Sequence, residues 1–389
     1  MKVTQERCGR KSQRGMTLVE LMVALTVGLF LTLGMTGVIV QTLRQQKIST
    51  AVNERDQSAT KALAQLDDFI RSAGSGFSNA GLSFTKGSQG FFGCKLRAAK
   101  VGDTLLPAKL AAPFDGVTSL VAPVMAPLVI ESGVGVNGSD VLFVMSGNGA
   151  YSNVPRRLVV GDASTLYFDN VIGFKSKDLL VVAGGSSSDC YISQVDTVTD
   201  APAGSASISL GGNYYLAEQD GARSLGEIAS AEDAFVAPIG STSAAYPTMS
   251  LLGVGSGDVL FQYDLLHTKS KTPQALAEGV SHLLALYGVD TTGDGKVDSW
   301  VSPSASGWTA AEVMQSPTKI EQILAVRIAV ITRSKGVRQS NVSPEKLYVF
   351  GSLGSSLKRE ITLSAEQRFQ RYRVMEIVIP VRNNLQIKS

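Results

Sequence analysis

The most prominent feature of the hydropathy pattern is a long apolar run close to the N-terminus. From Leu21 to Val40, twenty consecutive residues carry no charge, and a basic stretch over residues 1–15 precedes them. At about 1.5 Å per residue, a helix of this length spans roughly 30 Å, the thickness of the hydrocarbon core of a bilayer. Residues 21–40 are therefore predicted to cross a membrane. Because the positive charge lies before the run, we expect the N-terminus on the cytoplasmic side and the rest of the chain on the far side.

A helical pattern continues beyond the apolar run. Apolar residues recur at spacings of three, four and seven, namely Val52, Ala59, Leu63, Leu66, Phe69 and Ile70. This spacing places them on one face, so residues 41–73 are predicted to form an amphipathic helix. The glycines at 74 and 76 are expected to end it. The whole helix, over residues 16–73, would have its first half in lipid and its second half packed on a sheet.

The next two hundred residues alternate short β-favouring runs with turn residues. These runs lie at residues 141–144, 158–160, 166–168, 179–182 and 259–261. Gly, Ser and Ala separate them, which predicts a β-rich globular region over residues 74–270. Two turn-to-strand junctions, residues 138–143 and 256–261, resemble each other, but six residues do not establish a repeat.

The C-terminal region, residues 271–389, is expected to mix helices and strands. Thr272 and Pro273 have the character of a helix start. The apolar residues expected on one face of that helix are Leu276, Val280, Leu283, Leu284 and Tyr287. A second helix should begin at Thr309, which is spaced from Glu312 as in a capping box. Strands are expected over 322–333, 346–350 and 371–381. This order favours an α+β fold with a largely antiparallel sheet.

Composition excludes several classes of function. Of the 389 residues, 44% are hydrophobic and 18% charged, so the body is expected to be globular. A net charge of +3 is too small to require nucleic acid as a partner. Only two histidines and three cysteines are present, and neither a nucleophile elbow nor a phosphate loop occurs. From Pro317 onward, thirteen Lys and Arg face five Asp and Glu. That excess could guide docking of neighbouring subunits or attract DNA, and a set of solvated strand faces is the alternative.

The start of the chain carries a family resemblance. Glu20 borders the apolar run, where an ionised carboxylate facing lipid costs several kcal/mol and needs a partner. No small-x-small site follows Val40, so a cleaved secretory signal is disfavoured. Residues 14–25 resemble the leader of type IV prepilins and type II secretion pseudopilins, although Met replaces the usual Phe. The resemblance implies that prepilin peptidase cleaves after Gly15, that Met16 is N-methylated and that Glu20 is an assembly contact.

Four segments near the other end resemble the PilW family of minor pilins. They are residues 276–280, 287–290, 326–329 and 371–383. The resemblance implies a pilin-like, non-enzymatic subunit that initiates or joins type IV pilus assembly. Its implied partners are other minor pilins, the major pilin and a pilus-tip adhesin. It would lie in the inner membrane as a single-pass protein with a periplasmic body, and then in the pilus at the cell surface.

Three alternatives stay open at this point. The first is a membrane-anchored, surface-exposed binding module or adhesin, whose ligand contacts would lie in residues 95–250. The second is a type II secretion pseudopilin, and the third is an exported, anchored enzyme. Loss of filaments on deletion would favour the structural role, whereas normal filaments with lost adhesion would favour the adhesin.

The cysteines divide between leader and body. Cys8 lies in the leader and should leave with it, so Cys94 and Cys190 remain as a pair. On a chain exported to an oxidising compartment such a pair is expected to form a disulfide. Two separately buried thiols are the alternative.

An acidic loop is a candidate calcium site. Asp290, Asp294 and Asp298 stand at positions one, five and nine, with Gly295 at position six, which resembles an EF-hand loop. The remaining candidate ligands are the Thr292 hydroxyl at position three and the Lys296 carbonyl at position seven. The loop departs from the pattern at position twelve, where Val301 replaces the bidentate acid. Calcium is the only cofactor that the sequence indicates, and an ordinary solvated Asp-Gly turn is the alternative.

Overall fold

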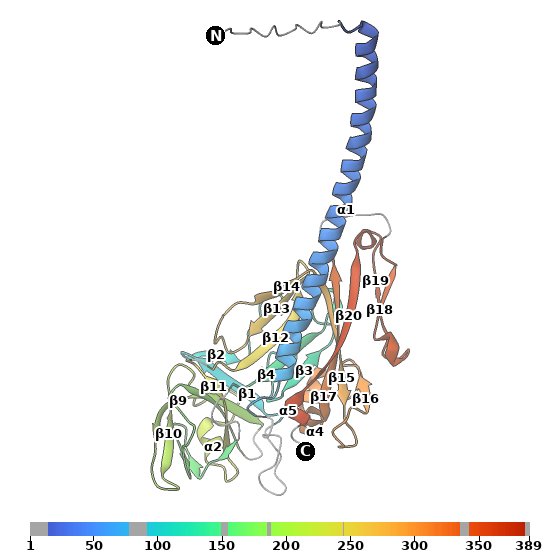
Figure 1. The fold of residues 1–389 in the computed structure, drawn as a ribbon. Helices are drawn as coiled ribbons and strands as arrows, with labels where there is room; N and C mark the ends of the chain where they lie inside the picture. Colours follow the sequence, from blue (N-terminus) through green and yellow to red (C-terminus); the bar gives the residue numbers. More distant parts are fainter. Residues whose placement is uncertain are drawn as a thin grey trace, which may run out of the picture. The chain divides into compact units, whose positions relative to one another are not determined.

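The computed structural model describes residues 15–77, 92–148, 155–184, 188–243, 245–334 and 342–385. The chain forms two compact units, Met1–Asn53 and Glu54–Ser389. Figure 1 shows the elements of both units along the sequence. The fold is α+β, with one long helix and a β-rich body whose sheets are largely antiparallel. The regions expected over 74–270 and 271–389 lie within the same compact unit.

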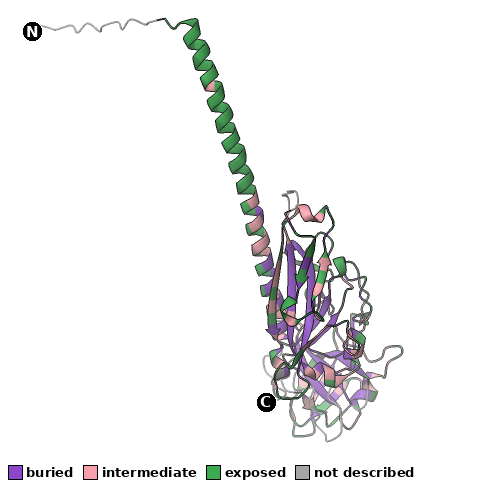
Figure 2. Ribbon diagram, turned by 90° about the vertical axis from the view of Figure 1, so that its right-hand side faces the viewer, coloured by how far each residue is buried: buried purple, intermediate pink, exposed green. Residues whose placement is uncertain are grey.

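Helix α1 runs from Leu18 to Ser72, which confirms the long N-terminal helix. Most side chains up to residue 50 are exposed, and the chain becomes increasingly buried after residue 54 (Figure 2). By length and composition α1 can cross a membrane, with a mean hydropathy of 2.2 over its most apolar window. Threonine hydroxyls in the apolar part donate to backbone carbonyls one turn earlier, as Thr26 does to Val23 at 2.9 Å. The hydroxyls are thereby satisfied without water.

Among the described residues the largest sheet has nine strands, and its only parallel pair there is β1 with β9. Along the main path the order is β5 (Arg156–Arg157), β11 (Phe235–Ser241), β8 (Asp178–Ala183), β9 (Asp189–Thr199), β10 (Ala206–Leu210), β7 (Thr165–Phe168) and β6 (Val160–Gly161). Strands β1 (Lys95–Lys100) and β2 (Asp103–Leu106) join this sheet through β9. The strand expected over 158–160 overlaps β6 only at Val160.

Two further sheets and a hairpin complete the body. The five-stranded sheet has the order β14 (Gln274–Glu278), β13 (Val259–Asp264), β12 (Thr248–Gly255), β4 (Val141–Ser146) and β3 (Leu128–Glu131). The four-stranded sheet has the order β16 (Ser299–Val301), β15 (Val280–Val289), β17 (Ile323–Arg333) and β20 (Tyr372–Pro380). The hairpin consists of β18 (Lys346–Val349) and β19 (Arg359–Thr362). The short helices are α2 (Leu225–Ala229), α3 (Ala310–Met314), α4 (Pro317–Gln322) and α5 (Arg382–Leu385).

Three hydrophobic cores hold these layers together. The main core takes Leu66 and Ile70 from α1 together with inner residues of all three sheets. A second core lies on the other face of the nine-stranded sheet, where α2 packs. Strand β8 supplies both cores, since Leu179 and Val181 enter the first and Leu180 and Val182 the second. The third core lies between the four-stranded sheet and the hairpin β18–β19.

The prediction of a helix after Thr272 is wrong. Residues 274–278 and 280–289 form strands β14 and β15, and all ten residues of β15 are buried. Leu283 and Ala285 enter the main core, whereas Leu284 and Leu286 face the hairpin. A strand buried on both faces is a continuous apolar run, which periodicity cannot distinguish from a helix. The capped helix expected at Thr309 and the three C-terminal strands are confirmed within one or two residues.

The two similar turn-to-strand junctions, residues 138–143 and 256–261, each contain a buried aspartate. Asp140 precedes β4 and Asp258 precedes β13, and these two strands flank β12. Asp140 is fully buried and accepts two hydrogen bonds from Arg359 at 3.2 and 3.1 Å. Asp258 is nearly buried and forms an ion pair with Arg333. Each buried carboxylate therefore has a cationic partner, without which burial would be costly.

Both histidines of the chain are held in surroundings that disfavour the charged form. Burial lowers the pKa of His282 from its ordinary value of 6.5, and Asp258 raises it less than burial lowers it. Burial also lowers the pKa of His267. Below about pH 6.5 the unfolded chain binds protons that the folded chain does not. The folded state is therefore expected to lose stability as the pH falls through this value.

We predict that the free energy of unfolding decreases between pH 7.5 and 5.5, by at most about 1.4 kcal/mol per pH unit for each histidine. His282→Gln should make this decrease shallower, because the side chain no longer takes up a proton on unfolding. Denaturant titrations of the detergent-solubilised chain at the two pH values measure both slopes. Identical slopes for the variant and the parent chain would contradict the prediction.

Candidate assembly site, disulfide and acidic loop

The residues at the predicted cleavage junction are exposed, and the first turn of α1 is capped. Gly15, Met16 and Thr17 precede the helix, and all three are solvent-exposed. The Glu20 carboxylate accepts through Oε2 from the backbone N–H of Thr17 and from the Thr17 hydroxyl, each at 3.0 Å. The Thr17 hydroxyl in turn accepts from the Glu20 N–H at 3.3 Å. Thr17 and Glu20 thus form a reciprocal capping box.

This cap gives Glu20 a partner within its own chain, which the sequence analysis did not foresee. The signal was present, because threonine followed by glutamate three residues later is the capping-box pattern. Both bonds use Oε2, and Oε1 has no hydrogen bond to any described residue. The carboxylate can therefore hold the helix start with one oxygen and accept from another group with the other.

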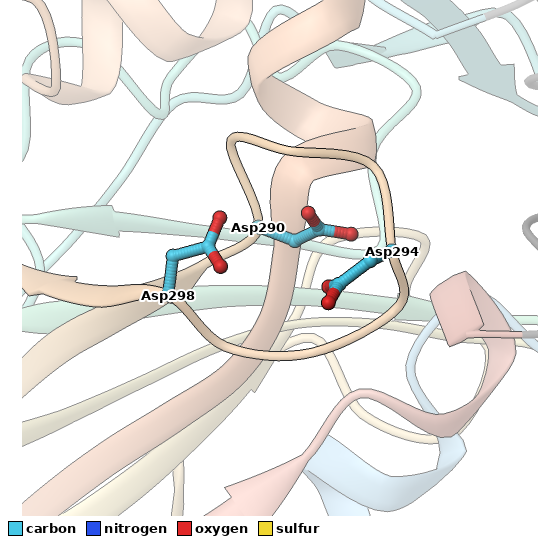
Figure 3. A group of neighbouring side chains, drawn as sticks. All are labelled: Asp290, Asp294 and Asp298. Atoms are coloured by element: carbon cyan, nitrogen blue, oxygen red, sulfur yellow. The ribbon is translucent and has the colours of Figure 1, made fainter.

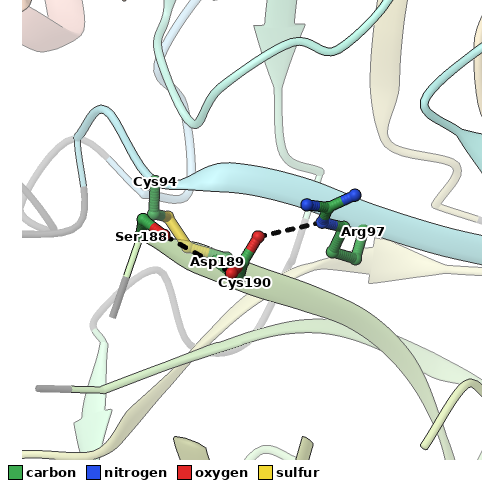
Figure 4. Close-up of a disulfide and its surroundings, with 5 residues drawn as sticks. All are labelled: Cys94, Arg97, Ser188, Asp189 and Cys190. Atoms are coloured by element: carbon green, nitrogen blue, oxygen red, sulfur yellow. Dashed lines mark hydrogen bonds and ion pairs between the residues drawn. A yellow bond between two sulfur atoms is a disulfide. The ribbon is translucent and has the colours of Figure 1, made fainter. Parts of the chain in front are cut away.

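Cys94 and Cys190 are joined, which confirms the expected disulfide (Figure 4). Their Cα atoms are 5.7 Å apart, within the usual range for such a bond. Cys94 lies just before β1, whose Leu96 pairs in parallel register with Cys190 of β9. The bond thus fastens the parallel pair β1–β9 through two cysteines that are 96 residues apart in sequence.

A buried ion pair lies beside the disulfide. Arg97 donates from Nε to Asp189 at 2.9 Å, and both side chains are largely shielded from solvent. Figure 4 shows this pair on the two strands that the disulfide joins. Covalent and ionic contacts therefore fix the same register, and removing either charged partner alone would leave a buried charge.

The three aspartates of the acidic loop come together. The loop connects β15 to β16, and carboxylate oxygens of Asp290, Asp294 and Asp298 lie within 4.8 Å of one another. Figure 3 shows the three side chains around the inside of the loop. Asp290 is buried and the other two are exposed. This is an oxygen-rich cluster of the kind that hard cations prefer.

The other expected ligands give a mixed fit to calcium. The Thr292 hydroxyl is 3.4 Å from oxygens of both Asp290 and Asp298, so it lies at the cluster. Val301 lies in β16 and offers no carboxylate. The ammonium of Lys296 lies 3.7 Å from Asp294 and competes with a cation there. With one oxygen from each carboxylate and one from the hydroxyl, the cluster supplies four ligands, fewer than calcium takes without carbonyls and water.

The same carboxylates also hold the loop in shape. Asp290 accepts from the N–H groups of Gly293 and Gly295, at 2.5 and 2.9 Å. Asp298 accepts from the N–H of Thr291 at 2.7 Å and from that of Thr292. The bonds from Thr291 are the main cause that lowers the pKa of Asp298 below its ordinary value. Asp298 is therefore ionised at neutral pH, and its role in the turn requires no ion.

Several cations of the positive C-terminal stretch form ion pairs within the body. Arg359 pairs with Asp140 and Arg333 with Asp258. Arg373 pairs with Asp56 of α1, which lies in the same compact unit. Arg327–Glu376 and Lys346–Glu360 are pairs within the stretch itself. Five of its cations are therefore used in internal contacts, and three of these fasten C-terminal strands to earlier parts of the body.

Comparison with known families agrees with the resemblance at both ends. Residues 243–383 match the family described as Type IV Pilus-assembly protein W, and residues 10–36 match the Prokaryotic N-terminal methylation motif. The first match includes every strand from β12 to β20. No curated protein and no solved structure matches the chain.

We predict that the disulfide contributes to stability mainly by restricting the unfolded chain. Replacing both partners, Cys94→Ser with Cys190→Ser, should lower the free energy of unfolding by up to roughly 4.7 kcal/mol, the value for a loop of about 100 residues. Denaturant unfolding under non-reducing conditions measures the loss. Cys8→Ser is the matched control and should change nothing, because Cys8 lies in the predicted leader. A double variant as stable as the parent, or recovery of both thiols in their free form, would contradict the prediction.

Proposed function

We propose that this chain, a PilW-family protein with a prepilin-type N-terminus, is a minor pilin that initiates type IV pilus assembly or joins the filament. The observation that carries the proposal is the combination of the methylation motif at one end with the PilW match at the other. The apolar part of α1 supports it, because pilus subunits are stored in a membrane before assembly. Prepilin peptidase would cleave after Gly15, and Met16 would then carry the N-methyl group.

The proposal includes a location and a set of partners. The subunit would cross the inner membrane once through the apolar part of α1, in contact with lipid, with its body in the periplasm. From there it would enter the pilus and reach the cell surface. Other minor pilins and the major pilin are its proposed neighbours, with a pilus-tip adhesin as a further partner. The disulfide supports an oxidising compartment for the body. The role is that of a building block and not of an enzyme.

The PilW match favours a type IV pilus over a type II secretion system. The minor-pilin role and the adhesin alternative predict different effects when the gene is deleted. A minor pilin that starts assembly is required for normal pilus number, whereas an accessory adhesin is required only for attachment. Counting surface pili in a deletion strain therefore separates the two roles.

Within this proposal, Glu20 is the contact that admits a subunit to the filament. Its Oε2 is occupied by the cap, and its Oε1 is available to the methylated amine of a neighbouring subunit. At about 4 Å and an effective dielectric constant near 20, such a pair gains roughly 4 kcal/mol before desolvation costs. A carboxylate left unpaired among packed helices is penalised instead, so Glu20 would also select the correct axial register.

We predict that Glu20→Ala impairs pilus assembly but not leader cleavage or membrane insertion. Two matched variants separate the charge from the cap. Glu20→Gln keeps an oxygen for the capping box but loses the charge, so it should fail as Glu20→Ala does. Thr17→Val loses the capping hydroxyl but keeps the carboxylate, so it should still assemble.

The measurement is a count of surface pili in strains that carry each variant as the only copy. Intact mass of membrane-extracted protein should show a chain that begins at N-methylated Met16 in every case. An N-terminus at Met1, or beyond Val40, would overturn the prepilin-type proposal itself. Normal pilus number with Glu20→Ala, and normal recovery of the variant in sheared filaments, would show that Glu20 is not the contact.

A separate part of the proposal is that the acidic loop binds calcium. The three clustered carboxylates and the Thr292 hydroxyl would be ligands, with the carbonyl of Lys296 and water completing the shell. The ion would neutralise the like charges at the hairpin between β15 and β16. Its role would be to stabilise the body outside the cell, and no catalysis is assigned to it.

We predict that calcium raises the melting temperature of the chain. Binding to the folded state alone stabilises it by about 2.7 kcal/mol at a hundredfold excess over the dissociation constant. Thermal unfolding with calcium and with chelator measures the effect, and Asp294→Asn should reduce it. Lys296→Ala should increase it, because the competing ammonium is removed. An unchanged melting temperature with and without calcium would reject the site.

A further inference from the structure

A polar cleft opens on the body where β1, β9 and the segment after β11 approach one another. We call it the polar cleft and define it by Lys100, Lys177, Gln194, Tyr214 and Tyr246. Its volume is about 340 Å³, within the range of small-molecule sites. No acidic side chain lines it, so its character is cationic.

Lys100 is a half-buried cation without a carboxylate partner. Its ammonium donates to the His267 carbonyl at 2.5 Å and lies 5.1 Å from the centre of the Tyr214 ring. No ion pair joins it to an acid in the part of the chain that the structure describes. The nearby Asp264 carboxylate accepts instead from the Thr268 hydroxyl at 2.7 Å and from two backbone N–H groups. Burial of the ammonium lowers its pKa. Asp264 opposes this shift by attraction without a direct ion pair, so an anion in the cleft would add the direct charged partner that Lys100 lacks.

The rest of the lining suits a ligand with many hydroxyl groups. Gln194 and Asn213 contribute amides, and Thr242 and Thr268 contribute hydroxyls. Amides and hydroxyls both donate and accept, as sugar hydroxyls do. Of the two tyrosines in the lining, Tyr214 is buried beneath the Lys100 ammonium, so the half-buried Tyr246 alone offers apolar ring surface for the C–H face of a sugar.

A second hollow continues the polar cleft. It has a volume of about 170 Å³ and shares Thr268 with the first, and its Pro247 follows Tyr246 in the chain. Phe69 of α1 and the amides of Gln262 and Gln274 line it. The second hollow also carries the Asp264 carboxylate and the Lys269 ammonium, so the two hollows share hydroxyl and amide groups but not their charge. Two adjoining hollows with such groups fit a ligand made of linked units better than a single small anion.

We propose that the polar cleft binds an acidic oligosaccharide, with the acidic group of one sugar near Lys100 and Lys177 and the next sugar in the adjoining hollow. The cleft would give the subunit a recognition function at the cell surface, beyond its proposed role in assembly. Lys177 is exposed at the rim and would attract the anion from solution. Lys100 is deeper and would fix its position.

The test uses the mature full-length chain in detergent. The probes are oligogalacturonate, alginate oligosaccharides and sialylated oligosaccharides, with methyl-esterified oligogalacturonate and inorganic phosphate as comparators. We expect binding of at least one acidic probe, at least tenfold weaker binding of its neutral counterpart, and weakening by salt. Lys100→Gln should reduce affinity at least tenfold and Lys177→Ala about threefold to fivefold. Lys109→Ala removes an exposed lysine outside the lining and should bind as the parent does.

Lys177→Ala keeps the test valid if Lys100→Gln does not fold, because Lys177 is exposed and contributes no buried contact. Failure of all acidic probes to bind would overturn the proposal. So would equal binding of the acidic and neutral oligogalacturonates, or affinity unchanged by Lys177→Ala. Binding of phosphate alone would overturn the assignment to saccharides. Pilus number is counted in strains that carry each lysine variant as the only copy. Loss of binding with a normal number of pili separates this site from the assembly role.

Discussion

Strand β15 makes contacts on every side, and the arrangement of the body depends on them. Its backbone pairs with β16 and β17, while its two faces enter different hydrophobic cores. Asp140 accepts from the Ala285 N–H at 2.8 Å and donates its own N–H to the Leu283 carbonyl. The Asp258 carbonyl accepts from the Val280 N–H at 2.9 Å. The two aspartates at the strand starts of β4 and β13 thus join the five-stranded sheet to the four-stranded one through β15.

These joints account for two of the cations in the C-terminal third. A buried aspartate that bonds to backbone N–H groups still holds a full charge, and the low dielectric of the interior penalises it unless a cation is close. Arg359 and Arg333 supply that charge from β19 and β17. Three cations of the stretch after Pro317, counting Arg373 with Asp56, are therefore paired with acids that lie earlier in the chain. Loss of either arginine would leave a buried carboxylate unpaired and would destabilise the folded body.

Local chemistry could be predicted from the sequence, whereas choices that depend on burial could not. The length of α1, the cap at Thr309 and the disulfide each rest on spacing, residue type or compartment, and all three are confirmed. The Thr17–Glu20 cap also follows from local spacing, but the cost of the Glu20 carboxylate in lipid points to a partner in another subunit and not to this cap. Strand β15 was mistaken for a helix because its second buried face is created by the hairpin β18–β19. That hairpin is more than fifty residues further along the chain, so the residues around β15 do not indicate that it covers this face.

The part of the chain that matches the PilW family cannot form this body by itself. Strands β12 to β14 lie within the match, but β3 and β4 complete their sheet from outside it. The main core also takes residues of β8, β9 and β11, which all precede residue 243. The polar cleft lies across this boundary, with Lys100 and Lys177 outside the match and Tyr246 and Thr268 inside it. Neither lysine takes part in the joints around β15, so substitutions there would alter the proposed binding site and leave the contacts that hold the fold intact.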